Sequence, residues 1–288
     1  MKQIITIDVG GTSIKYGLWN HKYRNLSSKG KIKTPDNLED FYQVLEIIVA
    51  NFSDEQIDGV GLSIPGAVDQ RRGMICGISA LPYIHNFPIQ AAIEERLGLP
   101  VTMENDANCA ALAEISMGVA THMQNIIFVV VGTGVGGSVV VHRQIVHGSH
   151  RLGGEFGMIL GHGNKRLSFL GTAVHMAQDY NRANQTNLTG KEVLQLAENG
   201  DKKAQKYTKS MFYNLAKVIY NLQFVIDPEA IVIGGGVLEN QYFLDTLEST
   251  IKNLVENIED IKLIPHLIPA KYHNDSNLIG AAYNYFYG

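Results

Sequence analysis

The chain has 288 residues, of which 45% are hydrophobic and 18% are charged, and its formal net charge at pH 7 is −4. This length favours two compact lobes with a cleft between them over one simple core. The negative charge, without long runs of Lys or Arg, excludes a surface that follows nucleic-acid phosphates.

The amino-terminal segment combines a strand pattern with a glycine-rich turn. β-Branched residues 4–7 lead into Asp8-Val9-Gly10-Gly11-Thr12, and residues 14–19 continue as a strand. A dinucleotide-binding fold would begin a helix there, so the pattern argues against that class. Since the strand begins at once, and neither a signal-peptide pattern nor a membrane-length apolar run is present, we expect a cytoplasmic protein that does not enter a membrane.

The first lobe is predicted to cover residues 1–118. Its expected elements are a helix after Pro35, a strand at 59–64, a helix from about Pro88 to Gly98, a strand at 101–104 and an Ala-rich helix at 107–117. The carboxy-terminal helix, residues 275–288, is expected to pack back and complete this lobe.

The second lobe, residues 119–274, begins with a repeat of the amino-terminal pattern. The strand at 126–131 enters Gly132-Thr133-Gly134-Val135-Gly136-Gly137, which predicts a hairpin and suggests an ancient duplication. Amphipathic helices at 204–224 and 239–257 flank a strand at 231–233, which is followed by Gly234-Gly235-Gly236.

The three glycine-rich turns together indicate a nucleotide site. Glycine allows the backbone to approach a phosphate closely and to direct consecutive N–H groups at it, and the hydroxyls of Thr12 and Thr133 add donors. A single turn of this kind is more often a structural hairpin. Three such turns, each directly after a strand, favour phosphate binding.

A polar sequence, Glu104-Asn105-Asp106-Ala107-Asn108, lies where a strand ends and a helix begins. Ligands of α/β folds bind at such ends. Asp106 is the candidate general base, because a carboxylate that faces a bound γ-phosphate can accept the proton of a substrate hydroxyl. The alternative is that Asp106 or Asn105 only caps the helix.

Other polar residues have two interpretations each. Asp8 is expected to hold Mg²⁺ through water near the phosphates, or else to be a turn aspartate. Lys15 is in a position to approach a phosphate as well, but is better interpreted as a surface lysine. Glu155, framed by Gly153-Gly154 and Gly157, suits sugar hydroxyls or is a solvated loop acid.

The ordered set of motifs resembles the ROK family of sugar kinases, within the actin, Hsp70 and sugar-kinase superfamily, over essentially the whole chain. The motifs that carry the resemblance are residues 7–12, 61–69, 104–114, 132–137 and 153–157. The resemblance implies an α/β fold of two actin-like (ribonuclease H-like) ATPase lobes, with mixed sheets and an interlobe cleft. It also implies ATP and Mg²⁺ as cofactors, transfer of the γ-phosphate to a hexose hydroxyl, usually the 6-hydroxyl, and a homodimer.

The resemblance also assigns site residues. It makes Asp106 the base at the sugar and gives sugar binding to Asn105 and Glu155. The remaining sugar contacts are expected from Pro65, Gly66, Ala67 and Ser79. The residues expected to contact ATP are Asp8, Gly10, Gly11, Thr12, Thr133, Gly134, Gly235 and Gly236.

The sequence departs from the family at the zinc-binding loop. Met158 stands where many members have a histidine, and residues 165–172 replace the cysteine-rich loop, so no zinc site is expected. Cys76 and Cys109 are the chain's two cysteines, and His162 and His175 do not complete a four-ligand shell.

The same region bears on substrate choice. Val174 aligns with a second sugar-binding glutamate of the family, so two polar sugar contacts are replaced by apolar ones. An apolar lining suits a substituted anomeric oxygen better than a free hydroxyl. This favours a β-glucoside kinase, with glucose and N-acetylmannosamine as the other candidate substrates.

Two further classes of function stay open. ROK-like domains also occur in sugar-responsive regulators, but those carry a DNA-binding helix-turn-helix before the sugar domain, and we expect none here because the first strand begins near Met1. A sugar sensor that has lost catalysis is disfavoured because Asp8, Asp106 and all three glycine turns are present.

Overall fold

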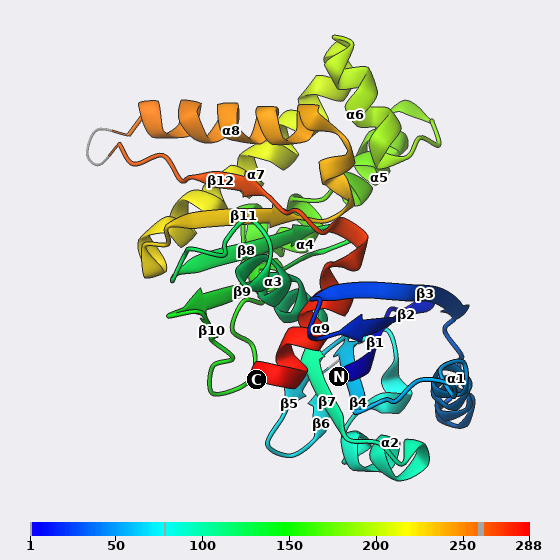
Figure 1. Ribbon diagram of the computed structural model, residues 1–288. Coiled ribbons are helices and arrows are strands. Elements are labelled where there is room, and N and C mark those ends of the chain that lie inside the picture. The colour runs from blue at the N-terminus through cyan, green and yellow to red at the C-terminus, as the bar shows by residue number, and fades with distance from the viewer. Residues whose placement is uncertain (1, 78, 259–261) are drawn as a thin grey trace. The chain divides into compact units, whose positions relative to one another are not determined.

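The computed structural model describes residues 2–77, 79–258 and 262–288. The chain divides into two compact units (Figure 1). Unit 1 comprises Met1–Thr121, Gly148–Leu152 and Asn274–Gly288, and unit 2 comprises His122–His147 and Gly153–His273. Among the residues described, no helix combines the length and the apolar character that crossing a bilayer requires.

Unit 1 is built on a five-stranded sheet with the order β3-β2-β1-β4-β7. The strands are β1 (Gln3–Val9), β2 (Ser13–Asn20), β3 (Asn25–Lys33), β4 (Gly59–Ile64) and β7 (Val101–Asn105). β1, β4 and β7 are parallel, whereas β2 is antiparallel to both of its neighbours. The predicted strands are confirmed, while β3 and the small hairpin of β5 (Ala67–Asp69) and β6 (Met74–Cys76) add to them.

Helices cover both faces of this sheet. They are α1 (Leu38–Ala50), α2 (Ile89–Leu97), α3 (Asp106–Ser116) and α9 (Ser276–Tyr287). Ile5 and Ile7 belong to one core cluster with Phe41 of α1, whereas the sheet residue Gly61 lies against Ala281 of α9. Gly61 pairs with Thr6, the residue between Ile5 and Ile7. Because successive side chains of a strand point to opposite faces of the sheet, α1 and α9 lie on opposite faces.

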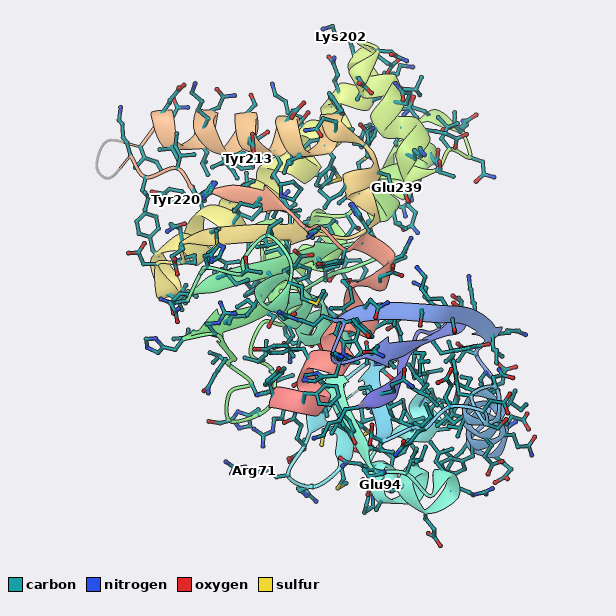
Figure 2. All side chains as sticks on the ribbon, in the orientation of Figure 1. Arg71, Glu94, Lys202, Tyr213, Tyr220 and Glu239 are labelled. Atoms are coloured by element: carbon teal, nitrogen blue, oxygen red, sulfur yellow. The ribbon has the colours of Figure 1, made fainter. Side chains whose placement is uncertain are left out.

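Two side-chain contacts connect different segments of unit 1, one between neighbouring elements and one between segments distant in sequence. The carboxylate of Glu94 on α2, labelled in Figure 2, accepts a hydrogen bond from the backbone N–H of Val101 at 3.0 Å, at the start of β7. The guanidinium of Arg151 lies 3.3 Å from the carboxylate of Asp69, which brings the segment Gly148–Leu152 to this unit. Desolvation raises the pKa of Asp69, but the hydrogen bond and charge of Arg151, together with the backbone N–H groups of Arg71 and Arg72, outweigh it, so the pKa is lowered.

Unit 2 repeats the sheet topology of unit 1, with the order β10-β9-β8-β11-β12. The strands are β8 (Ile126–Val131), β9 (Val135–Val141), β10 (Gln144–Ile145), β11 (Ala230–Gly234) and β12 (Leu267–Pro269). β8 is antiparallel to β9 and parallel to β11, as β1 is to β2 and β4. The repeat seen at the glycine turns therefore extends to the whole sheet.

The helices of unit 2 pack over a shared apolar core. They are α4 (Leu167–Leu170), α5 (Ala173–Asn184), α6 (Gly190–Glu198), α7 (Lys202–Ile226) and α8 (Gln241–Glu256). α7 begins at Lys202, because Asp201 accepts a hydrogen bond from the N–H of Ala204 at 2.7 Å and caps the helix. Figure 2 also marks Tyr213 on this helix, whose side chain stays exposed while Phe212 is buried in the core.

Candidate functional site

The candidate site residues of unit 1 gather at one edge of its sheet. Asp8 of β1 pairs with Ser63 of β4, and Ser63 pairs with Glu104 of β7. Because the three strands are parallel, their carboxyl ends meet at the same edge. Asp8, the loop that follows β4 and the dipeptide Asn105-Asp106 are therefore neighbours.

Asp8 is a buried carboxylate with two hydrogen-bond donors on one oxygen. Its Oδ1 accepts hydrogen bonds from Ser63 Oγ and from Asn277 Nδ2 of α9, each at 2.9 Å. The ammonium of Lys15 lies 4.0 Å from its Oδ2. Asp8 is thus more than a solvated turn residue, because two other segments of unit 1 donate hydrogen bonds to it, and Lys15, interpreted above as a surface lysine, lies beside it.

The first glycine turn, residues 10–12, directly follows β1 and Asp8 in the chain. The N–H of Gly10 donates to the carbonyl of Ser13 at 3.1 Å, and Thr34 Oγ donates to the carbonyl of Gly10 at 2.6 Å. A Cβ on Gly11 would lie 3.0 Å from Cβ of Ala80, so the turn passes close to the segment that contains Ser79. Gly11 and Thr12 are exposed, as a backbone site for a phosphate requires.

Asn105 and Asp106 are at the start of α3. Asn105 is the N-cap, because its Oδ1 accepts from the N–H groups of Ala107 at 2.9 Å and Asn108 at 3.2 Å. Asp106 Oδ1 also accepts from the N–H of Ala107 at 2.8 Å. The capping interpretation is therefore correct for Asn105. It leaves the Asp106 carboxylate half-buried in the first helical turn, where the positive end of the helix dipole stabilises negative charge.

Glu104 fixes the position of this dipeptide through hydrogen bonds of its carboxylate. It is 1% exposed, and its Oε1 accepts from the N–H of Asn105 at 2.7 Å and from Asn108 Nδ2 at 2.9 Å. Its Oε2 accepts from Gln70 Nε2 at 2.8 Å. A buried carboxylate with this many donors fixes the backbone from which Asp106 extends.

The residues expected to contact sugar in unit 1 lie close together. Asn105 Nδ2 donates to the carbonyl of Gly66 at 3.0 Å, which connects the dipeptide to the loop Pro65-Gly66-Ala67. Ser79 Oγ lies 2.6 Å from Nε2 of His85, and this imidazole also lies beside Gly66. Unit 1 therefore brings together Asn105, Gly66 and Ser79.

The two glycine turns of unit 2 also meet at one sheet edge. Gly234 of β11 pairs with Val130 of the parallel strand β8, so both strands end side by side. Gly235 has φ +101°, and a Cβ there would overlap the carbonyl oxygen of Val131. Only glycine fits this close approach. It brings Gly235 and Gly236 next to the turn of Thr133 and Gly134.

Glu155 lies in unit 2, just before the short 3₁₀ helix Phe156–Met158. Partial burial raises the pKa of its carboxyl group, although the side chain keeps solvent access. Within the described part of the chain, no residue donates a hydrogen bond to this carboxylate. It is therefore available for hydroxyl donors of a ligand.

The segment that replaces the zinc-binding loop forms helix α4 and its surroundings. Phe169 contacts the ring of His175, with centroids 4.6 Å apart, and Arg166 lies over the ring of Phe169. His175 Nδ1 lies 2.9 Å from Thr172 Oγ. Among the described residues, no group of three or more His, Cys, Asp or Glu side chains is arranged to hold a metal ion.

Sequence reasoning did not identify Ser63, Asn277, Gln70 and His85 as parts of the site. Asn277 is 269 positions from Asp8, so no local pattern could have paired them. A signal did exist for Ser63, since a polar residue inside the buried run of β4 needs a partner on a neighbouring strand.

Comparison with known proteins gives consistent results over the full length. The β-glucoside kinase of Klebsiella pneumoniae is 31% identical over 294 residues, which cover 98% of this chain and 96% of that protein. A ROK family protein of Streptococcus pneumoniae TIGR4, solved in complex with sucrose, is 34% identical with a TM-score of 0.90 and covers 99% of this chain and 98% of its own.

The ROK family glucokinase of Streptomyces griseus, solved with glucose and AMPPNP, is 25% identical with a TM-score of 0.81, over 97% of this chain and 98% of its own. The fold of this chain is accordingly the α/β fold of the actin-like ATPases. The family model for ROK proteins matches residues 4–285, and the chain belongs to the ROK family.

Proposed function

We propose that the protein is an ATP-dependent kinase that transfers the γ-phosphate of ATP to a hydroxyl, the 6-hydroxyl, of a hexose or hexoside. The observation that carries this proposal is the sheet edge of unit 1, where Asp8, the first glycine turn and Asn105-Asp106 are neighbours. The Streptomyces griseus relative supports it, since AMPPNP is an analogue of ATP.

The roles follow from the chemistry of each group. Asp106 accepts the proton of the attacking sugar hydroxyl, and Asn105, Glu155, Ser79 and residues 65–67 hold the sugar. Backbone N–H groups of the glycine turns, Gly10 to Thr12 in unit 1 and Thr133, Gly134, Gly235 and Gly236 in unit 2, bind the phosphates of ATP. The two units are then the two lobes of the kinase.

Asp8 is the residue that would hold Mg²⁺ through water. The donor set fits this ion, because Mg²⁺ keeps several waters and needs only one or two carboxylates besides phosphate oxygens. When bound, Mg²⁺ supplies charge neutralisation at the phosphate oxygens. Ser63 and Asn277 fix one oxygen of the carboxylate and leave Oδ2, 4.0 Å from the ammonium of Lys15, as the oxygen that would accept from a water of the ion.

We expect Asp8→Asn to raise the Mg²⁺ concentration needed for half-maximal activity by about 10- to 100-fold, as loss of an outer-sphere ligand does. Activity measured against Mg²⁺ at saturating ATP and sugar checks this. Asn277→Ala keeps the carboxylate and loses one of its donors, so a smaller shift in the same direction is expected. An unchanged Mg²⁺ requirement in Asp8→Asn contradicts the role.

The substrate we propose is a β-glucoside. Met158 is 57% exposed and Val174 is 38% exposed, so each presents an apolar surface in unit 2, with Met158 three residues after Glu155. An apolar surface favours a substituted sugar over one with a free anomeric hydroxyl. The β-glucoside kinase of Klebsiella pneumoniae supports the same choice.

A screen of ADP release across glucose, N-acetylmannosamine, cellobiose and aryl β-glucosides tests the proposal. We expect the highest kcat/KM with a β-glucoside and a 6-phosphate in the product by ³¹P NMR. The matched variant Met158→His restores the polar residue common in the family and is expected to shift preference towards glucose. Preference of the wild type for N-acetylmannosamine contradicts the β-glucoside assignment, and no ADP release with any sugar contradicts the kinase.

Two further properties belong to this proposal. The ROK resemblance favours a homodimer, which light scattering of the purified protein tests directly. The need for ATP favours the cytoplasm as the compartment, which fractionation of the native host tests.

A further inference from the structure

His85 is a buried imidazole that lies between two of the segments proposed to bind sugar. It follows the short 3₁₀ helix Pro82–Ile84 and is 9% exposed. Its Nε2 lies 2.6 Å from Ser79 Oγ. This distance is short for a nitrogen–oxygen pair and indicates a strong hydrogen bond.

Gly66 leaves room for the imidazole ring of His85 because it has no side chain. Gly66 has φ +105°, and a Cβ there would lie 2.8 Å from Ile75 Cγ2 and 3.2 Å from His85 Cε1. The absence of a side chain lets the imidazole pack against this loop. The carbonyl of Gly66 accepts from Asn105 Nδ2 at 3.0 Å, so the ring contacts the same loop that Asn105 holds.

The protonation state of His85 decides which way the Ser79 hydroxyl points. Desolvation lowers the pKa of His85, and the opposing effect of the Gly77 backbone is smaller. The ring is therefore neutral at pH 7, and we assign its one ring hydrogen to Nδ1, the nitrogen that does not face Ser79. Nε2 is then an acceptor, and the Ser79 hydroxyl donates its proton to it.

One lone pair of Ser79 Oγ is already used, because the N–H of Leu81 donates to it at 3.2 Å. With its proton directed at His85, the hydroxyl has only acceptor capacity left for a ligand. A sugar hydroxyl that meets Ser79 must therefore be the donor.

We propose that His85 is a positioning residue that holds the Ser79 hydroxyl as a hydrogen-bond acceptor for the sugar, and so sets sugar affinity without touching the sugar itself. The inference rests on the proposed function. It adds a residue to the site that acts only through Ser79, which distinguishes it from a residue that merely fills the core.

The test compares His85→Phe, His85→Gln and Ser79→Ala, alone and combined, in steady-state kinetics with the preferred sugar. The size of one hydrogen bond predicts that His85→Phe and Ser79→Ala each raise sugar KM by about 2- to 10-fold. We expect kcat and the KM for ATP to stay within twofold. The double variant Ser79→Ala/His85→Phe is expected to match Ser79→Ala alone.

His85→Gln is the rescue variant, because the amide oxygen can accept the Ser79 proton, and we expect its sugar KM to stay near that of the wild type. His21→Gln is the matched control, since His21 of unit 1 stacks on Phe286 with ring centroids 3.9 Å apart and has no part in this pair. Melting temperatures of all variants identify any that fail to fold.

Additive effects of Ser79→Ala and His85→Phe, or an unchanged sugar KM in either single variant, would overturn the inference. If His85→Phe does not fold, a His85→Gln protein as weak as Ser79→Ala overturns it equally. If the wild type releases no ADP with any sugar, the kinase proposal fails separately, and sugar Kd values from calorimetry then replace KM, with the same expected pattern.

Discussion

Asp106→Asn is expected to lower kcat by about 10²- to 10⁴-fold, the range that loss of a general base produces. The amide has the shape of the carboxylate but cannot accept the proton of the sugar hydroxyl. Its oxygen can still accept from the N–H of Ala107, as Asp106 Oδ1 does, so the start of α3 is preserved. Sugar Kd should therefore stay within a few-fold of the wild type.

Single-turnover phosphorylation and calorimetric sugar binding, measured on the same preparation, check both halves of this prediction. Asp275→Asn is the matched control, because Asp275 pairs with Lys29 on the surface of unit 1 at 2.9 Å and its loss should leave kcat unchanged. Turnover of Asp106→Asn near the wild-type rate would remove Asp106 from the role of base.

Local sequence patterns predicted most strands of the two sheets, because the central strands are continuous apolar runs. β1, β4, β8 and β11 are buried almost throughout, and a run of β-branched residues that leads into glycine identifies such strands. β3 escaped prediction because it is an exposed edge strand, rich in Lys and Ser, whose residues show little burial pattern.

The site was predictable only where its residues are close in sequence. The dipeptide Asn105-Asp106 stands out because a strand end and a helix start meet there; the structure shows the cap at Asn105, and the role of Asp106 as a functional acid stays a prediction. Contacts between distant segments, such as Asn277 with Asp8 or His85 with Gly66, depend on how helices and loops pack, which no local spacing encodes.

Helix α3 packs against α9, a long-range contact that no local sequence pattern specified. α3 presents small residues, Ala107, Ala110, Ala111 and Ala113, and α9 contributes Gly280, Ala281 and Ala282. The two helices contact each other, and α9 also contacts β1, β4 and β7 of the same sheet (Figure 1). α9 thus supports both the helix that carries Asp106 and, through Asn277, the carboxylate of Asp8.

Gly280→Ala is expected to lower the free energy of unfolding of unit 1 by about 1 to 3 kcal/mol, the cost of overpacking a close contact. This loss of stability is opposite to the usual effect of a Gly→Ala change in a helix interior, where alanine is favoured over glycine by roughly 0.5 to 1 kcal/mol. A Cβ at position 280 would overlap the backbone carbonyl of Cys109 on α3, and backbone cannot yield as a flexible side chain does. Gly280→Val should cost more, since two further methyl groups enter the same contact.

Denaturant unfolding of Gly280→Ala measures this change, with Tyr287→Ala as the control at the 63% exposed end of the same helix, where an effect within about 0.5 kcal/mol is expected. Because α3 must move away from α9 to admit the methyl group, Asp106 moves with it, and kcat should fall more than sugar affinity. A variant that is more stable than the wild type and equally active would show that α3 and α9 are not held by this contact, and that the position of Asp106 does not depend on the carboxy-terminal helix.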